Sequence, residues 1–296
     1  MKDSKQILAV GSIAYDSIKT PKGNRDRILG GSCTYFSIAA SYYAQTSIIG
    51  VVGEDFDQNS WNLLKKFNIN TDCVEVAEGK TFSWGGQYSE DYSTRETLFT
   101  NLGVFENFKP KVNIDLKEPI LYLGNIQPEL QLDVIKAVKS KSLIAADSMN
   151  LWIDLSPNKV WDLISKVDIF MLNDEEAIQL TNKKNLEQIA DDFMNHGPEI
   201  VIIKMGGEGS LVAYGDNKRY VSIVPGTPVY DPTGAGDSFA GGVLGYISNY
   251  GLDNPVEAVI NGSAVASYTV SGFGVENLCK LNKLELGKKI KEITFK

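Results

Sequence analysis

Short apolar runs alternate with longer segments of helical period along most of the chain. Runs rich in Val, Ile and Leu without polar alternation are typical of parallel strands covered on both faces, and the helical segments supply that cover. We therefore expect an α/β fold, a three-layer sandwich with a central, mostly parallel sheet flanked by helices. The predicted strands are Ile7–Gly11, Ser47–Val52, Ile120–Gly124, Leu143–Asp147, Asp168–Leu172, Ile200–Lys204 and Lys218–Val224. The predicted helices are Cys33–Ala44, Asn59–Phe67, Pro128–Lys139, Asn158–Val167, Asp174–Thr181, Asn185–Asn195, Ala235–Tyr250, Pro255–Ser271 and Leu281–Glu292.

Two stretches, approximately 12–29 and 80–105, interrupt this alternation with period-2 segments punctuated by Gly and Asn. We expect strands outside the main sheet there. The predicted main strands tend to end in small or polar residues, which would share the edge where ligands bind in such folds. Both stretches leave from that edge, so they predict a small β-sheet lid, the alternative being a plain surface hairpin. No linker, like-charge block or repeat divides the chain, so a single domain over 1–296 is expected.

The charge balance excludes several classes of protein. With 29 Lys+Arg against 37 Asp+Glu the net charge is −8, which argues against nucleic acid or an anionic membrane face as a partner. The single histidine, His196, rules out a His-paired metal site. Cys33, Cys73 and Cys279 form no C-x-x-C pair, so neither a disulfide framework nor a zinc site is expected. No apolar stretch reaches the ~20 residues of a bilayer span, and we expect a cytoplasmic protein.

The densest glycine cluster of the chain precedes a predicted helix. It runs Asp231-Pro232-Thr233-Gly234-Ala235-Gly236-Asp237, with the helical pattern following at once. A glycine turn at a helix N-terminus presents unpaired N–H groups and the positive end of the helix dipole, so it predicts an anion hole. A carboxylate beside an anion hole would repel the anion unless it has a task there. Asp237 is therefore a candidate general base for a hydroxyl that attacks a phosphoryl group, the alternative being an Asp that only favours the helix dipole.

Two common nucleotide-binding signatures do not fit. A dinucleotide fingerprint needs a small residue where Phe239 stands, and it follows the first strand rather than one near the end. A Walker motif is imitated by Gly79-Lys80-Thr81, but its first glycine would fall on Val74.

The segment Asp231–Gly242 resembles the C-terminal signature of the PfkB/ribokinase family of ATP-dependent sugar and nucleoside kinases, and the resemblance covers essentially the whole chain. The resemblance implies a ribokinase-like fold, in which a mostly parallel sheet carries a β lid made from two N-terminal excursions. The other segments that carry the resemblance are Gly11–Asp16, the double glycine Gly30-Gly31, Val51–Asp55, the Asn-x-x-Glu element Asn173–Glu176, and Ile203–Gly209.

The resemblance implies a role for each matching residue. Asp237 would deprotonate a primary alcohol of the acceptor, while the amides of Gly234, Ala235 and Gly236 stabilise the transferring γ-phosphoryl group. The acceptor would be held by Asp16, Gly30, Gly31 and the residue at Tyr35. ATP would bind at Asn173, Glu176, Lys204, Gly206 and Gly209, with Mg²⁺ near Glu176, largely through water. Asn261 would border the adenine or be an ordinary polar helix position, and Asp231 and Thr233 fall where several members bind a monovalent cation such as K⁺.

Two residues depart from the family pattern and bear on the substrate. The family usually has Asn where Tyr35 stands, so a polar contact to a sugar is in doubt. Lys204 stands where a Thr is often found, and it would either add positive charge at the phosphates or form a salt bridge elsewhere.

The acceptor is left open between a sugar and a nucleoside. Sugars need many directional polar contacts, and a nucleobase needs a flat slot with aromatic faces. The expected lid carries Phe82, Trp84, Tyr88 and Phe99, which would line such a slot, pack the lid sheet, or form a homodimer contact through the lid. Tyr15, Tyr35 and Phe36 on the acceptor side also favour a nucleoside. A non-catalytic nucleotide-binding regulator and a flavin- or NAD-dependent oxidoreductase are the alternatives of other classes, and the retained Asp237 argues against the regulator.

Overall fold

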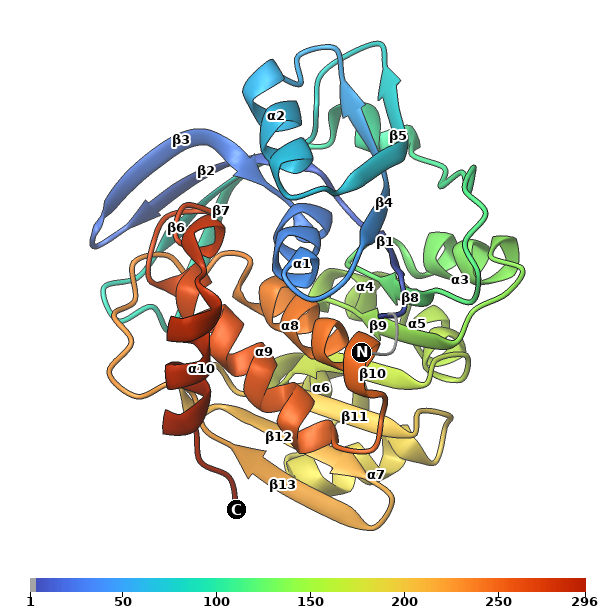
Figure 1. Ribbon diagram of the computed structural model, residues 1–296, viewed down its shortest axis with the longest axis vertical. Coiled ribbons are helices and arrows are strands. Elements are labelled where there is room, and N and C mark those ends of the chain that lie inside the picture. Colours follow the sequence, from blue (N-terminus) through green and yellow to red (C-terminus); the bar gives the residue numbers. More distant parts are fainter. Residues whose placement is uncertain (1–3) are drawn as a thin grey trace.

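A nine-stranded sheet with helices on both faces forms the body of the molecule, and a separate four-stranded sheet projects from one end of it (Figure 1). This computed structural model describes residues 4–296, so residues 1–3 of the expected domain lie outside the described part. The strand order of the large sheet is β13-β12-β11-β10-β9-β8-β1-β4-β5. Its strands are β1 (Ile7–Val10), β4 (Thr46–Gly53), β5 (Asn70–Ala77), β8 (Ile120–Leu123), β9 (Leu143–Asp147), β10 (Ile169–Asn173), β11 (Ile200–Lys204), β12 (Ser210–Tyr214) and β13 (Asn217–Val221).

The expected three-layer α/β architecture is confirmed. Strands β1, β4, β8 and β9 are buried along their whole length, as their unbroken apolar composition requires. The strands from β5 across to β11 pair in parallel, and only β12 and β13 at one edge are antiparallel. β5 and β12 were not among the predicted strands. β5 is an edge strand with a partly exposed, mixed pattern, and β12 follows β11 through a single short 3₁₀ turn, η2 (Gly206–Glu208).

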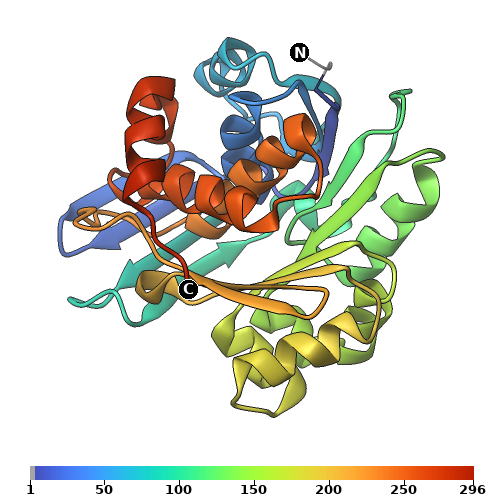
Figure 2. The same ribbon diagram turned by 60° about the horizontal axis from the view of Figure 1, so that its bottom comes forward.

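Helices cover the two faces of the sheet in separate groups, each with its own apolar core. One face is covered by α1 (Ser32–Ser41), α2 (Gln58–Lys66), α8 (Ala235–Tyr250), α9 (Pro255–Val270) and α10 (Lys283–Glu292). The other is covered by α3 (Pro128–Ala137), α4 (Asn150–Leu155), α5 (Pro157–Ile164), α6 (Asp174–Thr181) and α7 (Leu186–Met194), as Figure 2 shows. Two further 3₁₀ turns are η1 (Gly103–Asn107) and η3 (Leu278–Lys280). No helix in the described part of the chain combines the length and apolar character needed to cross a membrane.

The small sheet comes from the two stretches expected to form a lid. It consists of β2 (Ala14–Thr20), β3 (Gly23–Gly30), β6 (Ser83–Tyr88) and β7 (Arg95–Asn101) in the order β3-β2-β6-β7. The central pair β2 and β6 is parallel and the two outer pairs are antiparallel. Every residue of β7 is exposed. The expectation of a homodimer through this sheet stays a prediction.

Two hydroxyl contacts attach the β6–β7 hairpin to the loop before α8. The Tyr88 hydroxyl lies 3.0 Å from Oγ1 of Thr233, and the Tyr92 hydroxyl donates to the Val229 carbonyl at 3.1 Å. The small sheet is therefore joined directly to the glycine cluster, although the two segments lie 145 residues apart in sequence.

Candidate active site

The carboxyl ends of the parallel strands meet at one edge of the large sheet, as their pairing requires. Gln131 of α3, which is fully buried, fastens two of these ends by contacting the carbonyls of Leu123, Gly124 and Asp147 at 3.1, 2.9 and 3.0 Å. At the end of β1, the Ser12 amide donates to Ser32 Oγ and the Ser32 amide donates to Ser12 Oγ, both at 3.0 Å. These bonds hold the floor of the candidate site.

The glycine cluster forms a left-handed turn directly before α8. Gly234 is the N-cap of the helix, with φ of 74°. A Cβ at this position would lie 2.3 Å from the ring of Tyr35, so both backbone and packing require glycine there. The Ala235 amide donates to the Pro232 carbonyl at 3.2 Å and closes the turn. Ala235 is thus engaged within the protein, and the first-turn donors that remain for an anion are the amides of Gly234, Gly236 and Asp237.

Asp237 lies in the first turn of α8 and is partly buried. Burial and the neighbouring Asp147 carboxylate raise the pKa of Asp237 to about 7, although the Lys204 ammonium acts in the opposite direction. A carboxylate with a pKa near neutrality is a more effective proton acceptor than an ordinary one and is still ionised in a useful fraction.

Asp16 faces the same site from β2 of the small sheet. Its side chain is 4 % exposed, and burial together with the Asp231 and Asp237 carboxylates raises its pKa to about 7. A Cβ on Gly30 would lie 1.9 Å from the Asp16 carboxylate, and one on Gly31, whose φ is 89°, would lie 2.5 Å from the Ser12 carbonyl oxygen. The double glycine is therefore required by the close packing of Asp16 and of the β1 end.

The aromatic side chains expected on the acceptor side lie in the core instead. Tyr15, Tyr35 and Phe36 are 3 %, 1 % and 0 % exposed. The Tyr35 ring supports Gly234 from below, and Phe36 stacks on Tyr122 with ring centroids 3.9 Å apart. They cannot form an open slot for a nucleobase, because their faces are already covered. Of the aromatic residues in the small sheet, Trp84 and Tyr88 are partly exposed, and Trp84 lies under the guanidinium of Arg95.

The Asn-x-x-Glu element is a capping box at the start of α6. The Asn173 side chain accepts from the Glu176 amide at 2.7 Å, and Glu176 Oε2 accepts from the Asn173 amide at 2.9 Å. Burial raises the pKa of Glu176 to about 7. The spacing of these two residues thus has a structural reason that sequence reasoning missed, and it places a buried carboxyl at the strand edge.

Lys204 ends β11 and reaches Asp147 at the end of β9, with Nζ–Oδ2 at 2.6 Å. A Cβ on Gly236 would lie 3.2 Å from the same Nζ, so the ammonium lies beside the glycine turn. Asp147 was not among the predicted site residues. Gly206, with φ of 54°, has no atom within 4 Å of its Cβ position and is open to a ligand. Gly209 is different, because its Cβ position is filled by the Val221 carbonyl oxygen at 2.1 Å, so its glycine serves the packing of β13.

Asn261 belongs to the helix layer. It is 7 % exposed, its amide nitrogen donates to the Glu257 carbonyl at 2.9 Å, and its amide oxygen accepts from the Tyr43 hydroxyl at 3.1 Å. The first contact lies within α9, and the second joins α9 to the residues just after α1. Of the two roles open for this residue, the ordinary polar helix position is the one that the contacts support.

Asp231 and Thr233 lie together in the loop before the glycine turn. The fully buried Asp231 carboxylate accepts from the amides of Thr233 and Gly274, each at 2.9 Å. Burial raises its pKa. A cation next to this carboxylate would balance its negative charge, which the two neutral amide donors do not.

The donor set at the strand edge fits magnesium only in a largely hydrated form. Among residues 4–296, no cluster of three or more Asp, Glu, His or Cys side chains is arranged to hold an ion. One oxygen of Glu176 is taken by the capping box, and Asp147 is paired with Lys204. Magnesium that is bound mainly by phosphate and water oxygens suits such a site, because Mg²⁺ keeps several of its waters.

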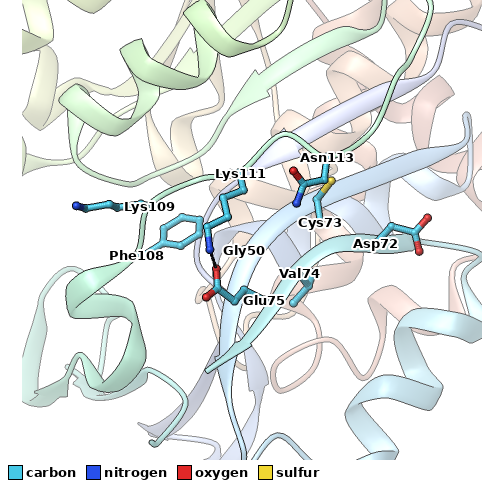
Figure 3. Close-up of a pocket in the computed structure, with 9 residues that line it drawn as sticks. All are labelled: Gly50, Asp72, Cys73, Val74, Glu75, Phe108, Lys109, Lys111 and Asn113. Atoms are coloured by element: carbon cyan, nitrogen blue, oxygen red, sulfur yellow. Dashed lines mark hydrogen bonds and ion pairs between the residues drawn. The ribbon is translucent and has the colours of Figure 1, made fainter. Parts of the chain in front are cut away.

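A separate cavity of about 200 Å³ opens at the edge strand β5 (Figure 3). Lys111 points toward Glu75 across it, with Nζ–Oε2 at 2.8 Å, and Asn113 lies beside Cys73. None of the site residues described above lines this cavity.

Residues 5–282 match the pfkB family of carbohydrate kinases. The chain belongs to this family. It is accordingly an ATP-dependent phosphotransferase of the PfkB type. The glycine turn, the capping box and the small sheet are thus parts of a PfkB-type kinase.

Curated relatives and solved structures are similar to this chain over nearly its full length. A cytidine kinase of Thermococcus kodakarensis is 24 % identical over 270 residues, which cover 86 % of this chain and 91 % of the relative. A nucleoside kinase of Methanocaldococcus jannaschii is 24 % identical over 286 residues, 92 % of each chain. The crystal structure of the M. jannaschii nucleoside kinase has a TM-score of 0.79 at 22 % identity, covering 98 % of this chain and 99 % of that chain. A Vibrio cholerae fructokinase mutant with fructose, ADP and potassium bound has a TM-score of 0.80 at 18 % identity, covering 98 % and 100 %. The fold is therefore ribokinase-like.

Proposed function

We propose that this kinase transfers the γ-phosphoryl group of ATP to a primary alcohol of a nucleoside, with Asp237 as the general base. The observation that carries the proposal is the position of Asp237, one residue after the Gly234–Gly236 turn at the N-terminus of α8. A proton acceptor and a set of amide donors for an anion thereby adjoin each other, as in-line phosphoryl transfer requires.

The chemistry assigns one task to each group. The Asp237 carboxylate takes the proton of the acceptor hydroxyl while the hydroxyl oxygen forms a bond to the γ-phosphorus. The bond from that phosphorus to the β,γ-bridging oxygen breaks, and ADP leaves. The amides of Gly234 and Gly236 donate to the γ-phosphoryl oxygens, and the open backbone at Gly206 admits the triphosphate. Magnesium at the Glu176 side would neutralise phosphate charge, and K⁺ beside Asp231 would balance that buried carboxylate.

A nucleoside is the favoured acceptor, and a sugar is the alternative. The relatives named cytidine kinase and nucleoside kinase cover more than four fifths of this chain. Within the site, Asp16 and the Gly31 backbone would hold ribose hydroxyls, and the partly exposed Trp84, which pairs with Asp16 across β2 and β6, would contact a flat base. The aromatic residues that favour a nucleoside are now those of the small sheet alone, since Tyr15, Tyr35 and Phe36 are buried.

The test is acceptor-dependent ADP formation by the purified protein with a panel of nucleosides and sugars. We expect turnover with at least one nucleoside and a loss of at least ~100-fold in Asp237→Ala, the order of a missing general base. The matched control is Glu257→Ala, which removes an acidic residue from the first turn of α9 and should leave turnover unchanged.

Each other outcome rejects a defined part of the proposal. Turnover with sugars only would reject the nucleoside acceptor. ATP binding without turnover on any acceptor would support the regulator instead. Full activity of Asp237→Ala would reject the assignment of Asp237 as the general base.

A further inference from the structure

A buried ion pair joins the ends of two strands that are not neighbours. Asp147 ends β9 and Lys204 ends β11, with β10 and its Asn173 between them. Strands lie about 4.8 Å apart, so the pair must span roughly 10 Å of sheet with its two side chains together. It does so with an Nζ–Oδ2 distance of 2.6 Å.

The pair is poorly explained as a device for stability. The Lys204 and Asp147 side chains are only 17 % and 6 % exposed, so both charges have lost most of their hydration. The desolvation of such a pair offsets much of its attraction, and a pair of apolar side chains often packs as well. Although burial acts to lower it, the Asp147 and Glu176 carboxylates raise the pKa of Lys204 above its ordinary value, so the ammonium stays charged at neutral pH.

The ammonium is aimed at the glycine turn. The nearest atom to a Cβ built on Gly236 is Nζ of Lys204 at 3.2 Å, and the next two are side-chain carbons of the same lysine at 3.9 Å. A lysine ammonium has three N–H donors. Among residues 4–296, Asp147 is the one hydrogen-bond acceptor recorded for this ammonium, so two donors remain for a ligand at the turn.

We propose that Lys204 contacts the transferring phosphoryl group and that Asp147 is the positioning residue that holds it there. The inference rests on the proposed function. During transfer, the ammonium keeps its proton and donates to a γ-phosphoryl oxygen, next to the amides of Gly234 and Gly236. The bonds made and broken are those of the proposed reaction, and Lys204 adds positive charge where negative charge accumulates.

Asp147 also keeps Lys204 away from the base. Asp237 and Glu176 both lie within electrostatic reach of the ammonium. Without Asp147, Lys204 would pair with the Asp237 carboxylate and compete with the acceptor proton for it. In nucleotide binding Asp147 thus acts through Lys204, so removing it should change nucleotide affinity only while the lysine is present.

Nucleotide binding tests the inference without any acceptor. Calorimetry with ADP and with the non-hydrolysable ATP analogue AMP-PNP, both with Mg²⁺, compares wild type with Lys204→Met, Asp147→Asn and the double variant. We expect Lys204→Met to weaken the binding of AMP-PNP at least ~10-fold and the binding of ADP less than ~3-fold, because only the analogue carries a γ-phosphoryl group. Asp147→Asn should change the ratio of the AMP-PNP affinity to the ADP affinity by a smaller factor than Lys204→Met does. Adding Asp147→Asn to Lys204→Met should change this ratio less than ~2-fold.

The control is Lys218→Met, which breaks an ion pair of the same 2.6 Å length, to Asp191, away from the glycine turn. It should leave both affinities unchanged. The double variant leaves no lone buried charge and keeps the test valid if a single variant fails to fold. Equal weakening of ADP and AMP-PNP by Lys204→Met would overturn the contact with the phosphoryl group, and additive effects in the double variant would overturn the positioning role. Wild-type protein that binds neither nucleotide would instead overturn the proposed function.

Discussion

At the scale of single residues, Asp237 should impose a pH dependence on catalysis. Burial and Asp147 raise its pKa to about 7, and the proposed mechanism needs its ionised form. The fraction of ionised carboxylate falls as the pH drops through this pKa. We therefore expect kcat/KM to fall about tenfold per pH unit below 6 and to level off above 8. A pH profile that stays flat from 5.5 to 8 would contradict the assignment of Asp237 as the base.

Asp16 should lower the stability of the fold at alkaline pH. Its folded pKa is raised to about 7 by burial and by Asp231 and Asp237, while the unfolded value stays near the ordinary one. The folded state thus holds the proton more tightly, and stability from this group is present at low pH and lost as the pH rises toward 7. Asp16→Asn should be more stable than wild type at pH 8, by up to about 4 kcal/mol at 1.4 kcal/mol per pKa unit, and about equal at pH 4.

Thermal and urea unfolding at both pH values would measure this difference. The exposed Asp216→Asn variant, placed in the turn between β12 and β13, is the control and should show no such dependence. An Asp16→Asn variant that is equally destabilised at pH 4 and pH 8 would show that the carboxylate is a net stabilising group.

At the scale of elements, the turn before α8 depends on glycine for two reasons. Gly234→Ala would place a Cβ in a left-handed backbone and 2.3 Å from the Tyr35 ring. We expect a loss of about 2–3 kcal/mol in the free energy of unfolding, together with a large loss of kcat. Gly215→Ala is the matched control, since Gly215 also has a positive φ but nothing within 4 Å of its Cβ position, and it should lose only about 1 kcal/mol. Equal losses in both variants, measured by urea unfolding, would argue against the Tyr35 contact.

The β6–β7 hairpin should be held down by its hydroxyl contacts. Tyr88→Phe removes the 3.0 Å bond to Thr233 and keeps the ring, so we expect a loss of about 1 kcal/mol that is local to the hairpin. Hydrogen exchange of residues 83–101 should become faster and the KM for the acceptor should rise, whereas Tyr250→Phe at an exposed end of α8 should change neither. Unchanged exchange in Tyr88→Phe would show that packing, not this bond, holds the hairpin.

Regular elements could be predicted because their cause is local. The helix beginning at Ala235 and the one beginning at Asp174 have the predicted bounds, since a glycine turn starts the first and a capping residue starts the second. The helix predicted from Asn158 begins one residue earlier, at Pro157, and α4 before it was missed because it has only six residues. A short helix has too few turns to show a period.

At the scale of the whole molecule, the site could be only partly predicted from the sequence. Asp237 and its glycines are contiguous, so the motif can be read directly from the chain. The pairing of Lys204 with Asp147 joins residues 57 positions apart through the order of three strands, which no local pattern encodes. Tyr35 was assigned to the acceptor, and its burial under Gly234 depends on how α1 packs against α8.

The net charge of the molecule leads to a prediction about salt. The chain carries −8 and its substrate ATP is also anionic, so long-range attraction cannot help binding. In the proposed site, attraction comes instead from buried or contiguous donors, the amides of the turn and Lys204, which solvent ions screen little. We expect the KM for MgATP to change less than ~2-fold when ionic strength rises from about 0.02 to 0.2 M, a range over which the Debye length falls from about 20 to 7 Å. Choline chloride at constant Mg²⁺ and K⁺ would vary the ionic strength without loading a cation site. A KM that rises tenfold would show that a basic surface patch, and not the turn, recruits the nucleotide.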